Sequence, residues 1–179
     1  MKMPASFFLA LVALTVPALA DAPTPEAVAA YLAANAQKPG VTVAADGLQY
    51  DVRRRGVGRH PAANDFARIQ YTARLIDGTL VDGTTPGLPA TVSVGAAIAG
   101  LGEALRMMQE GDRWQLVVPA RLAFGQKGAG AVPPNQPLVI DVTLIAAVSP
   151  ARAQAEAGPN PFSIQGNGQQ QSLLFTFRP

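Results

Sequence analysis

The sequence contains no cysteine, and this absence removes several kinds of chemistry at once. Disulfide bonds, thiolate metal sites and a cysteine nucleophile are all excluded. Histidine is scarce as well, since His60 is the single one in the chain. One histidine without a thiol cannot build a transition-metal site of the usual kind. We therefore expect His60 to lie in a surface loop.

Charge of either sign is also scarce, because charged residues make up only 15% of the 179 residues and the formal net charge is +2. The few basic residues form no stripe, which argues against a nucleic-acid partner. A glycine-rich phosphate loop, a Ser-His-Asp arrangement and a paired-carboxylate pattern are missing too. An apolar floor with a few polar groups is what is left. This pattern indicates a ligand pocket rather than an acid–base site.

Residues 1–20 have the pattern of a secretory signal peptide. Lys2 supplies the positive start, and the apolar run 7–16 is too short to span a bilayer. Ala18-Leu19-Ala20 forms a small-x-small cleavage pattern, so cleavage after Ala20 is expected. The predicted mature protein is exported and not embedded in the membrane, with the periplasm as its compartment if the source has two membranes.

The remainder divides into a lead-in, one domain and a tail. Residues 21–46 are expected to be a linker with a short helix over 25–36, which has proline near its start and an alanine-rich body. Residues 47–148 have the pattern of a folded domain. Residues 149–179 are rich in glycine, proline and glutamine, a composition that does not bury a core, so a disordered tail is predicted.

Within the domain, apolar and polar residues alternate in several short segments, which predicts half-buried strands. These segments are Leu48–Val52, Phe66–Leu75, Thr79–Val81, Ala90–Val94, Arg113–Val118 and Leu138–Ala147. Trp114 lies in one of them and is expected to pack in the core. Asp77-Gly78 gives the signal of a hairpin turn between the second and third segments. Five or six antiparallel strands with one helix across their face indicate an α+β half-barrel.

The expected helix lies within residues 100–111 and is the only strongly amphipathic one in the middle of the chain. Its apolar residues recur at i, i+3, i+4 and i+7, which places them on one face: Leu101, Ala104, Leu105 and Met108. Gly100 stands before this run, and Gly111 stands after it, where it can take the positive φ that commonly ends a helix.

Residues 47–148 resemble an FKBP-type peptidyl-prolyl cis–trans isomerase domain. The stretches that carry the resemblance are GLQYDV, IQYTARLIDGTLVD, VGAAIAGLGEALRMMQEGDRW and PARLAFGQKGAGAVPPNQPLVIDVTLI. The preceding NAQKPGVTVAADGLQYDV is similar to the lead-in of the exported branch that resembles macrophage infectivity potentiators. Members of that branch often dimerise through a long N-terminal helix. Only the short helix over 25–36 is expected here, which favours a monomer over a dimer.

The resemblance implies a twisted antiparallel sheet wrapped around the helix, with a proline-containing peptide bound between them. The expected partners are proline-containing polypeptides, namely unfolded exported proteins, and macrolide inhibitors are a further ligand that it implies. Rotation of an X-Pro bond breaks no covalent bond, because its barrier comes from amide resonance. A water-poor pocket that accepts the twisted amide better than the planar one lowers that barrier. No cofactor or metal is required.

The resemblance also implies which residues form the site. Tyr71 and Asp82 match the family's pocket tyrosine and aspartate, and Phe124 stands where the family usually has a tyrosine. Substrate-binding positions follow in the same way: Val81, Ala97, Ile98, Leu101, Val132 and Ile140. The connection over 125–134 is expected to overhang this pocket and to influence which substrates enter.

Several of these positions depart from the family pattern in one direction. Val81, Leu101 and Ile140 stand where the family usually has Phe, Trp and Phe, and Phe124 lacks the tyrosine hydroxyl. Smaller aliphatic walls widen a pocket and weaken its contact with a proline ring. One alternative is therefore an isomerase of broad specificity and reduced activity. The other is a non-catalytic, FKBP-like peptide-binding chaperone or scaffold, and we favour the enzyme.

Overall fold

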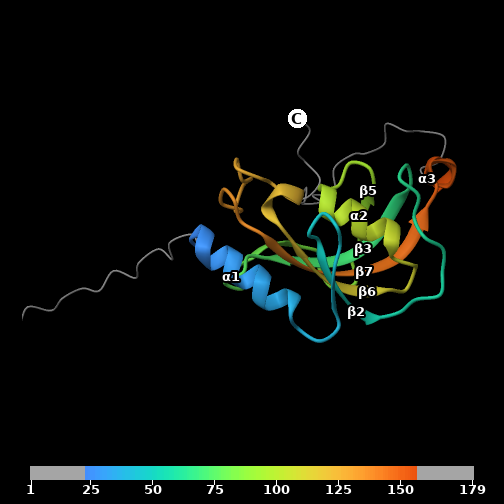
Figure 1. Cartoon of the computed structure of the whole chain (residues 1–179). Helices are drawn as coiled ribbons and strands as arrows, with labels where there is room; N and C mark the ends of the chain where they lie inside the picture. Colours follow the sequence, from blue (N-terminus) through green and yellow to red (C-terminus); the bar gives the residue numbers. More distant parts are fainter. Residues whose placement is uncertain (1–22, 157–179) are drawn as a thin grey trace, which may run out of the picture.

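The computed structural model describes residues 23–156, which fold around one sheet (Figure 1). The predicted signal peptide and residues 157–179 of the predicted tail lie outside the described residues. Within residues 23–156 the α+β class is confirmed, with an antiparallel sheet that packs against a short amphipathic helix. The sequence predicts the sheet from the alternation of apolar residues in the strands, and it predicts the helix from their 3.6-residue period.

Seven strands make up the sheet in the described part of the chain, one more than the expected maximum. Their order is β1-β2-β6-β7-β3-β4, and β5 also pairs with β3. All pairings are antiparallel. The strands are β1 (Val41–Val43), β2 (Gln49–Arg54), β3 (Phe66–Arg74), β4 (Leu80–Gly83), β5 (Ala90–Ser93), β6 (Arg113–Val118) and β7 (Leu138–Val148).

The additional strand is β1, which the sequence analysis did not predict. It has only three residues, and two of them are exposed, so its sequence carries no readable alternation. It forms because the chain turns back after α1 (Pro25–Ala36) and pairs Thr42 with Tyr50 of β2. Helix α1 itself begins at the predicted proline, and the hydroxyl of Thr24 accepts a hydrogen bond from the Ala27 amide at 3.2 Å.

A pair of amide side chains holds α1 against the sheet. The Asn35 amide nitrogen donates to Gln49 Oε1 at 2.8 Å, and Gln49 Nε2 donates to the Leu32 carbonyl at 2.9 Å. Asn35 and Gln49 are both buried, so these bonds satisfy groups that would be costly to bury alone. Helix α1 is therefore fixed on the sheet face that carries the Gln49 side chain.

Helix α2 (Ala99–Met107) covers the other face of the sheet and supplies the centre of the core. The four residues of its predicted apolar face are all fully buried: Leu101, Ala104, Leu105 and Met108. The C-terminal boundary differs from expectation, because Met108 already has an extended backbone with ψ of 152°. Gly111 does take a positive φ, of +93°, but it lies beyond the helix in the turn that leads to β6.

Two glycines allow α2 to approach the sheet closely. Gly100 lies inside the helix rather than before it, and a Cβ there would lie 2.5 Å from Val118 Cγ1. A Cβ on Gly102 would lie 2.7 Å from the carbonyl oxygen of Val94. Backbone oxygen cannot move aside as a side chain can, so glycine at position 102 is required by packing.

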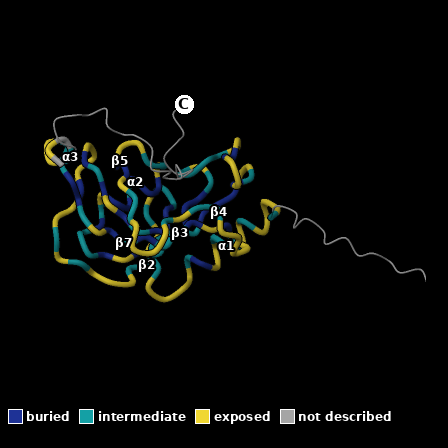
Figure 2. Tube along the Cα trace, turned by 180° about the vertical axis from the view of Figure 1, so that it is seen from behind, coloured by how far each residue is buried: buried dark blue, intermediate teal, exposed yellow. Residues whose placement is uncertain are grey.

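The burial pattern divides the two longest strands, β3 and β7, into a buried face and a more exposed one. In Figure 2 the buried stretches follow the strands and α2, whereas α1 and the loops are mostly exposed. Trp114 packs in the core as expected, 4% exposed and stacked on Tyr50 with ring centroids 4.8 Å apart.

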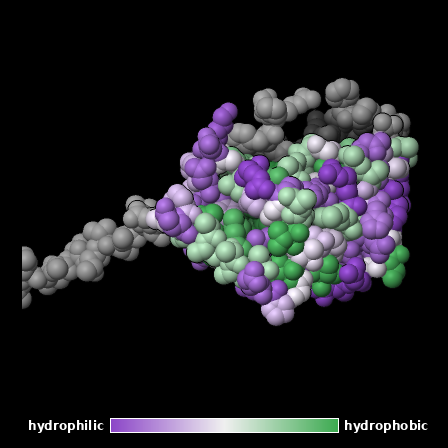
Figure 3. Space-filling view, viewed as in Figure 1, coloured by the Kyte–Doolittle hydropathy of each residue, from purple (hydrophilic) through white to green (hydrophobic). Residues whose placement is uncertain are grey.

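On the surface, hydrophobic residues gather toward the middle of the face in Figure 3, with hydrophilic residues around them. His60 is exposed, as predicted.

The chain leaves the sheet through β7 and continues into helix α3 (Pro150–Glu156). The prediction of a disordered tail from residue 149 onward is therefore wrong for these seven residues. Their sequence, PARAQAE, is rich in alanine with proline at the first position, a pattern that favours a helix. Apart from Pro150, the glycine and proline residues that indicated a disordered tail begin only at Gly158.

Candidate functional site

The site begins with a hydrogen-bonded pair on neighbouring strands. Tyr71 lies on β3 and its hydroxyl donates to Asp82 Oδ2 on β4 at 2.8 Å. Asp82 pairs with Ala73, which is two residues from Tyr71 on the same face of β3, so the two side chains are diagonal neighbours. The Tyr71 side chain is 2% exposed and its hydroxyl needs a partner there.

The carboxylate of Asp82 is fixed at both oxygens. Its second oxygen, Oδ1, accepts a hydrogen bond from the Gly83 amide at 2.8 Å, so the carboxylate is held from its own backbone and from the tyrosine. The side chain is only half-buried. A fixed, partly accessible carboxylate beside a buried phenol is a polar group that can orient a bound amide.

Apolar residues from three other parts of the chain form the surroundings of this pair. Leu101 of α2 and Ile140 of β7 are fully buried, and Val132 of the connection after β6 is 3% exposed. The other four predicted residues are partly buried and pack against the same core cluster: Val81, Ala97, Ile98 and Phe124. The structure thus places the predicted apolar residues in or against one cluster, to which Asp82 is joined through Tyr71.

Helix α2 points its N-terminus into this region. Ile98 is the N-cap residue, has an extended backbone with ψ of 145°, and makes no side-chain cap hydrogen bond. Its carbonyl accepts from the Gly102 amide at 2.9 Å, which starts the helix. Amide groups in a first helical turn have no partner within the helix. They give the Ile98 end of the site a polar edge of hydrogen-bond donors.

The connection that follows β6 is compact rather than extended. It starts with a 3₁₀ turn, η1 (Ala120–Leu122), and Ala129 and Val132 then exchange backbone hydrogen bonds of 2.9 and 2.8 Å. The Asn135 amide donates to the Gly125 carbonyl at 2.8 Å, closing the loop at its base. This folding turns the Val132 side chain inward, against the core.

A polar residue of the site that the sequence analysis missed is Thr84. Strands β5 and β4 pair with successive parts of one edge of β3, and the chain leaves the sheet between them, opposite Tyr71. The Thr84 hydroxyl accepts from the Tyr71 amide at 3.0 Å and donates to the Tyr71 carbonyl at 3.2 Å. The Thr84 amide also donates to that carbonyl, at 2.9 Å. A threonine that directly follows a strand end, two residues before a proline, is the available signal, since such residues bond to nearby backbone.

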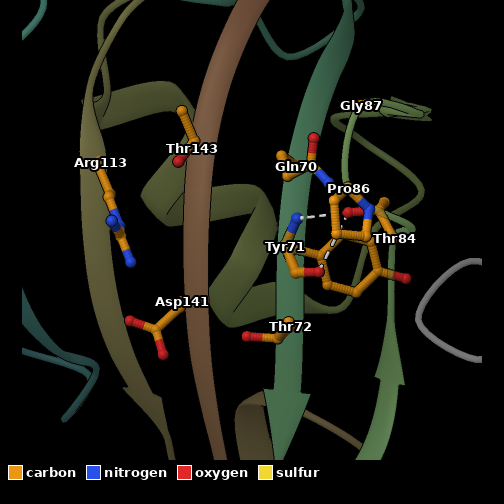
Figure 4. A pocket seen from close by; sticks show the side chains of 9 residues that line it. All are labelled: Gln70, Tyr71, Thr72, Thr84, Pro86, Gly87, Arg113, Asp141 and Thr143. Carbon is orange, nitrogen blue, oxygen red and sulfur yellow. Dashed lines mark hydrogen bonds between the residues drawn. The ribbon is translucent and has the colours of Figure 1, made fainter.

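Two hollows open beside the pair. One, of about 360 Å³, lies along β4 and is lined by Leu80, Val81, Asp82, Gly83, Thr72 and the 84–86 segment. The other, of about 540 Å³, lies on the sheet face away from α2 and has a floor of polar side chains from β3, β6 and β7 (Figure 4). A ligand can reach Val81 and Asp82 through the first hollow.

Two other kinds of site find no support in the described residues. Between positions 23 and 156 no group of three or more His, Cys, Asp or Glu side chains is arranged to hold a metal ion. Nor does that part of the chain include a helix of the length and hydropathy needed to cross a membrane.

Comparison with known proteins identifies the family. The model of the FKBP-type peptidyl-prolyl cis-trans isomerase matches residues 57–145, and the model of the domain amino terminal to it matches residues 19–52. A solved peptidyl-prolyl cis-trans isomerase from Pseudomonas syringae is 37% identical, with a TM-score of 0.66 over 72% of this chain and 98% of that one. The chain belongs to the FKBP family.

Curated relatives agree with this assignment and refine it. The chain is 43% identical over 122 residues to the FKBP-type isomerase FkpA of Aeromonas hydrophila, covering 68% of this chain and 46% of the relative. It is 44% identical over 118 residues to the isomerase Mip of Coxiella burnetii, covering 65% and 51%. The predicted resemblance to FKBP domains of the macrophage-infectivity-potentiator branch is confirmed. The chain spans about half the length of these relatives.

Proposed function

We propose that the protein is a peptidyl-prolyl cis–trans isomerase that acts on proline-containing polypeptides. The observation that carries the proposal is the Tyr71–Asp82 hydrogen bond, set against an apolar cluster from β3, β4, β7, α2 and the connection after β6. Family membership supports the same conclusion. The site residues named from the sequence are the ones proposed to act.

In this proposal the apolar residues and the polar pair have different tasks. Leu101 and Ile140 have no exposed surface, so they support the floor of the site from beneath rather than touch the proline ring. Val81, Ile98 and Phe124 are only partly buried and are the apolar residues proposed to contact the ring. The planar amide is stabilised by resonance, and water stabilises its dipole. A pocket of low polarity removes that stabilisation, so the twisted form of the X-Pro bond becomes less unfavourable relative to the planar one.

The polar groups then orient the amide as it rotates. First-turn amides of α2, beginning at Ile98, are the donors for a carbonyl group of the peptide. Asp82, held by Tyr71, faces the dipole of the rotating amide. No proton changes hands and no bond breaks in this mechanism, so the residues need only to bind and orient.

The partners and location of the protein belong to the same proposal. We infer that the leader directs the chain out of the cytoplasm and that its substrates are unfolded exported proteins. One relative, 42% identical over 118 residues, carries the name outer membrane protein MIP, from Legionella longbeachae. Macrolides are proposed as inhibitors of the site. The short α1 supports a monomer rather than a dimer.

The experiment is a measurement of X-Pro isomerisation in tetrapeptides that vary in the residue before proline. Asp82→Ala is expected to lower kcat/KM by about 10- to 100-fold, and Tyr71→Phe by less, because the carboxylate keeps its bond to the Gly83 amide. Val57→Ala, at an exposed position that lines neither hollow, is the control and is expected to keep its activity with tetrapeptides. Absence of acceleration by a folded wild type with every peptide would exclude the isomerase.

A second candidate function is a non-catalytic FKBP-like chaperone or scaffold that binds peptides. It is favoured by the four wall positions that lack the family's larger or hydroxyl-bearing side chains: Val81, Leu101, Phe124 and Ile140. Val81→Phe and Phe124→Tyr, at the two partly buried positions of this set, test whether the family's side chains raise activity. Suppression of aggregation of an unfolded protein, without any acceleration of X-Pro rotation, is the result that distinguishes this alternative.

A further inference from the structure

The outer face of the sheet, defined here as the face opposite α2, carries a hollow whose floor is built from polar residues. Its floor comes from side chains that are direct cross-strand partners: Gln70 pairs with Thr143, Thr72 with Asp141, and Arg113 with Thr143. Figure 4 shows these side chains on three adjacent strands, with α2 behind them. The hollow measures about 540 Å³. Because the hollow is open to solvent along the sheet, an extended peptide segment can lie across it, whereas small-molecule sites bury most of their ligand.

This hollow and the hollow along β4 adjoin one another. They share Thr72, Thr84 and Pro86 in their linings, and the β4 hollow also includes Val81 and Asp82 of the proposed isomerase site. We call the two together the outer groove. A polypeptide that leaves the proline site past Val81 and Asp82 therefore meets the groove directly.

The wall of the outer groove is held in place by hydrogen bonds. The segment 84–87 forms that wall, and Thr84 is fixed to both backbone groups of Tyr71. One residue further, the Gln70 amide nitrogen donates to the Thr85 carbonyl at 2.8 Å. These bonds arise from the sheet edge itself, so the groove is formed before any ligand arrives. A preformed groove lowers the entropic cost of binding a chain.

The chemistry of the floor distinguishes between kinds of ligand. It contains one cation, Arg113, and one anion, Asp141, among hydroxyl and amide groups. A strongly charged polymer of either sign gains little binding energy there, because one of these two side chains attracts it and the other repels it. A peptide backbone alternates donors and acceptors and matches a floor that offers both. Pro86 adds an apolar contact at the rim.

We propose that the outer groove binds the segment of a client polypeptide that flanks the isomerised proline. This inference rests on the proposed function, because the groove is continuous with that site. Crossing from β4 over β3 and β7 to β6 covers roughly 14 Å, which about four or five extended residues span. The protein therefore favours long unfolded chains over short peptides, and the groove selects polar, mixed-charge or uncharged flanking segments.

The test compares a tetrapeptide with the same sequence extended by about five polar residues on either side of the core. In the wild type the extended peptide is expected to show a kcat/KM about tenfold higher, equivalent to about 1.4 kcal/mol of binding. Thr143→Trp fills the floor of the groove on the sheet face opposite the Tyr71 and Asp82 side chains, and it is expected to abolish this gain while leaving tetrapeptide turnover unchanged. Ile145→Trp, two residues along the same face of β7 and outside the groove, is the matched control and is expected to keep the gain.

Binding of the extended peptide, measured by fluorescence anisotropy, separates this proposal from the proposed function. If the wild type turns over neither peptide but binds the extended one more tightly, and Thr143→Trp loses that difference, the groove stands and the isomerase does not. Equal affinity of wild type and Thr143→Trp for the extended peptide overturns the groove. The groove is also overturned if Thr143→Trp lowers turnover of the tetrapeptide as much as turnover of the extended peptide. A change in self-association of Thr143→Trp overturns it too, because the groove is then an interface between copies of this chain.

Discussion

The two faces of strand β3 show how differently one segment can be used. On the inner face, toward α2, Ile69, Tyr71 and Ala73 are buried in the core. The residues between them, on the outer face, are Gln70, Thr72 and Arg74, which are half-buried or exposed. Because side chains alternate along a strand, every second residue belongs to a different environment.

The comparison teaches that stability and recognition are divided between the faces. The inner face packs against a helix that approaches to within contact of backbone atoms, so its volumes are tightly constrained. The outer face carries polar groups whose losses cost little in folding but change what the surface can bind. The proposed isomerase site lies at the edge where the two faces meet, since Tyr71 is held by Asp82 through its side chain and by Thr84 through its backbone.

The largest effect is expected from Leu105→Ala in the centre of the inner side. Leu105 is fully buried on α2, and its truncation leaves a cavity that closely packed neighbours cannot fill. The free energy of unfolding should fall by about 3 kcal/mol. Urea denaturation monitored by Trp114 fluorescence measures it. Ile145→Ala on the outer face is the control, with an expected loss below about 1 kcal/mol, and equal losses would contradict the division between faces.

A smaller effect, of unusual sign, is expected from Gly102→Ala. In an exposed helix interior this change stabilises by about 1 kcal/mol. Here the new Cβ would lie 2.7 Å from the Val94 carbonyl oxygen, so the free energy of unfolding should fall by about 1 to 3 kcal/mol instead. Thermal and urea unfolding both report it. Arg106→Ala, at an exposed position of α2, should be nearly neutral. A stabilised Gly102→Ala protein would show that α2 lies further from the sheet.

Thr84→Val tests the link between the faces. The variant keeps the side-chain volume but cannot accept the hydrogen bond from the Tyr71 amide, so the free energy of unfolding should fall by about 1 kcal/mol. Hydrogen exchange at the Tyr71 amide should accelerate in Thr84→Val. Thr84→Ser retains the hydroxyl and should restore protection. Unchanged exchange in Thr84→Val would mean that the backbone of Tyr71 is held by other contacts.

The smallest expected effect concerns the solvent side of α2 and depends on pH. A side-chain hydrogen bond with Asp46 raises the pKa of Glu103, and the same contact lowers the pKa of Asp46. The contribution of Glu103 is lost as the pH rises through its raised pKa, and that of Asp46 is lost as the pH falls through its lowered pKa. The contact therefore contributes most in the acidic window between the two pKa values.

Glu103→Gln is the corresponding variant, because its amide can donate to Asp46 at every pH. Its urea midpoint should rise relative to wild type as the pH increases from about 4 to 7. The change is expected to be small, since both side chains are largely accessible to water. Glu26→Gln, which removes one exposed carboxylate on α1 and leaves the Asp46–Glu103 contact intact, is the control for a general charge effect. If the difference in urea midpoint between wild type and Glu103→Gln does not vary with pH, Glu103 and Asp46 do not share a proton.

Much of the fold could be predicted from the sequence because its periodicities are strong. The range of β6 was predicted as observed, and the four buried residues of α2 follow from their spacing alone. Strand β1 could not be predicted, since three residues carry no pattern and depend on the pairing with β2. The end of α2 was expected further along the chain than Met107, because Met108 is buried whether it is helical or extended.

The candidate site shows the same limit. The resemblance to the family predicted Tyr71 and Asp82 as site residues. The structure joins them by a hydrogen bond, and their roles remain predictions. Thr84 and the outer groove were not foreseen, because their members come from β3, β6, β7 and a loop. Each of these segments appears ordinary by itself, and only the strand order brings their polar residues together.

The sequence by itself determined which residues face inward, because alternation in strands and the helical period are local properties of the chain. It also determined the family, through segments whose glycine and proline spacing is specific. Only the tertiary structure decided which inward and outward residues become neighbours. Register and strand order join residues far apart in the chain, as Tyr71 with Asp82 and Thr72 with Asp141, and these pairings depend on the packing of the whole sheet against α2.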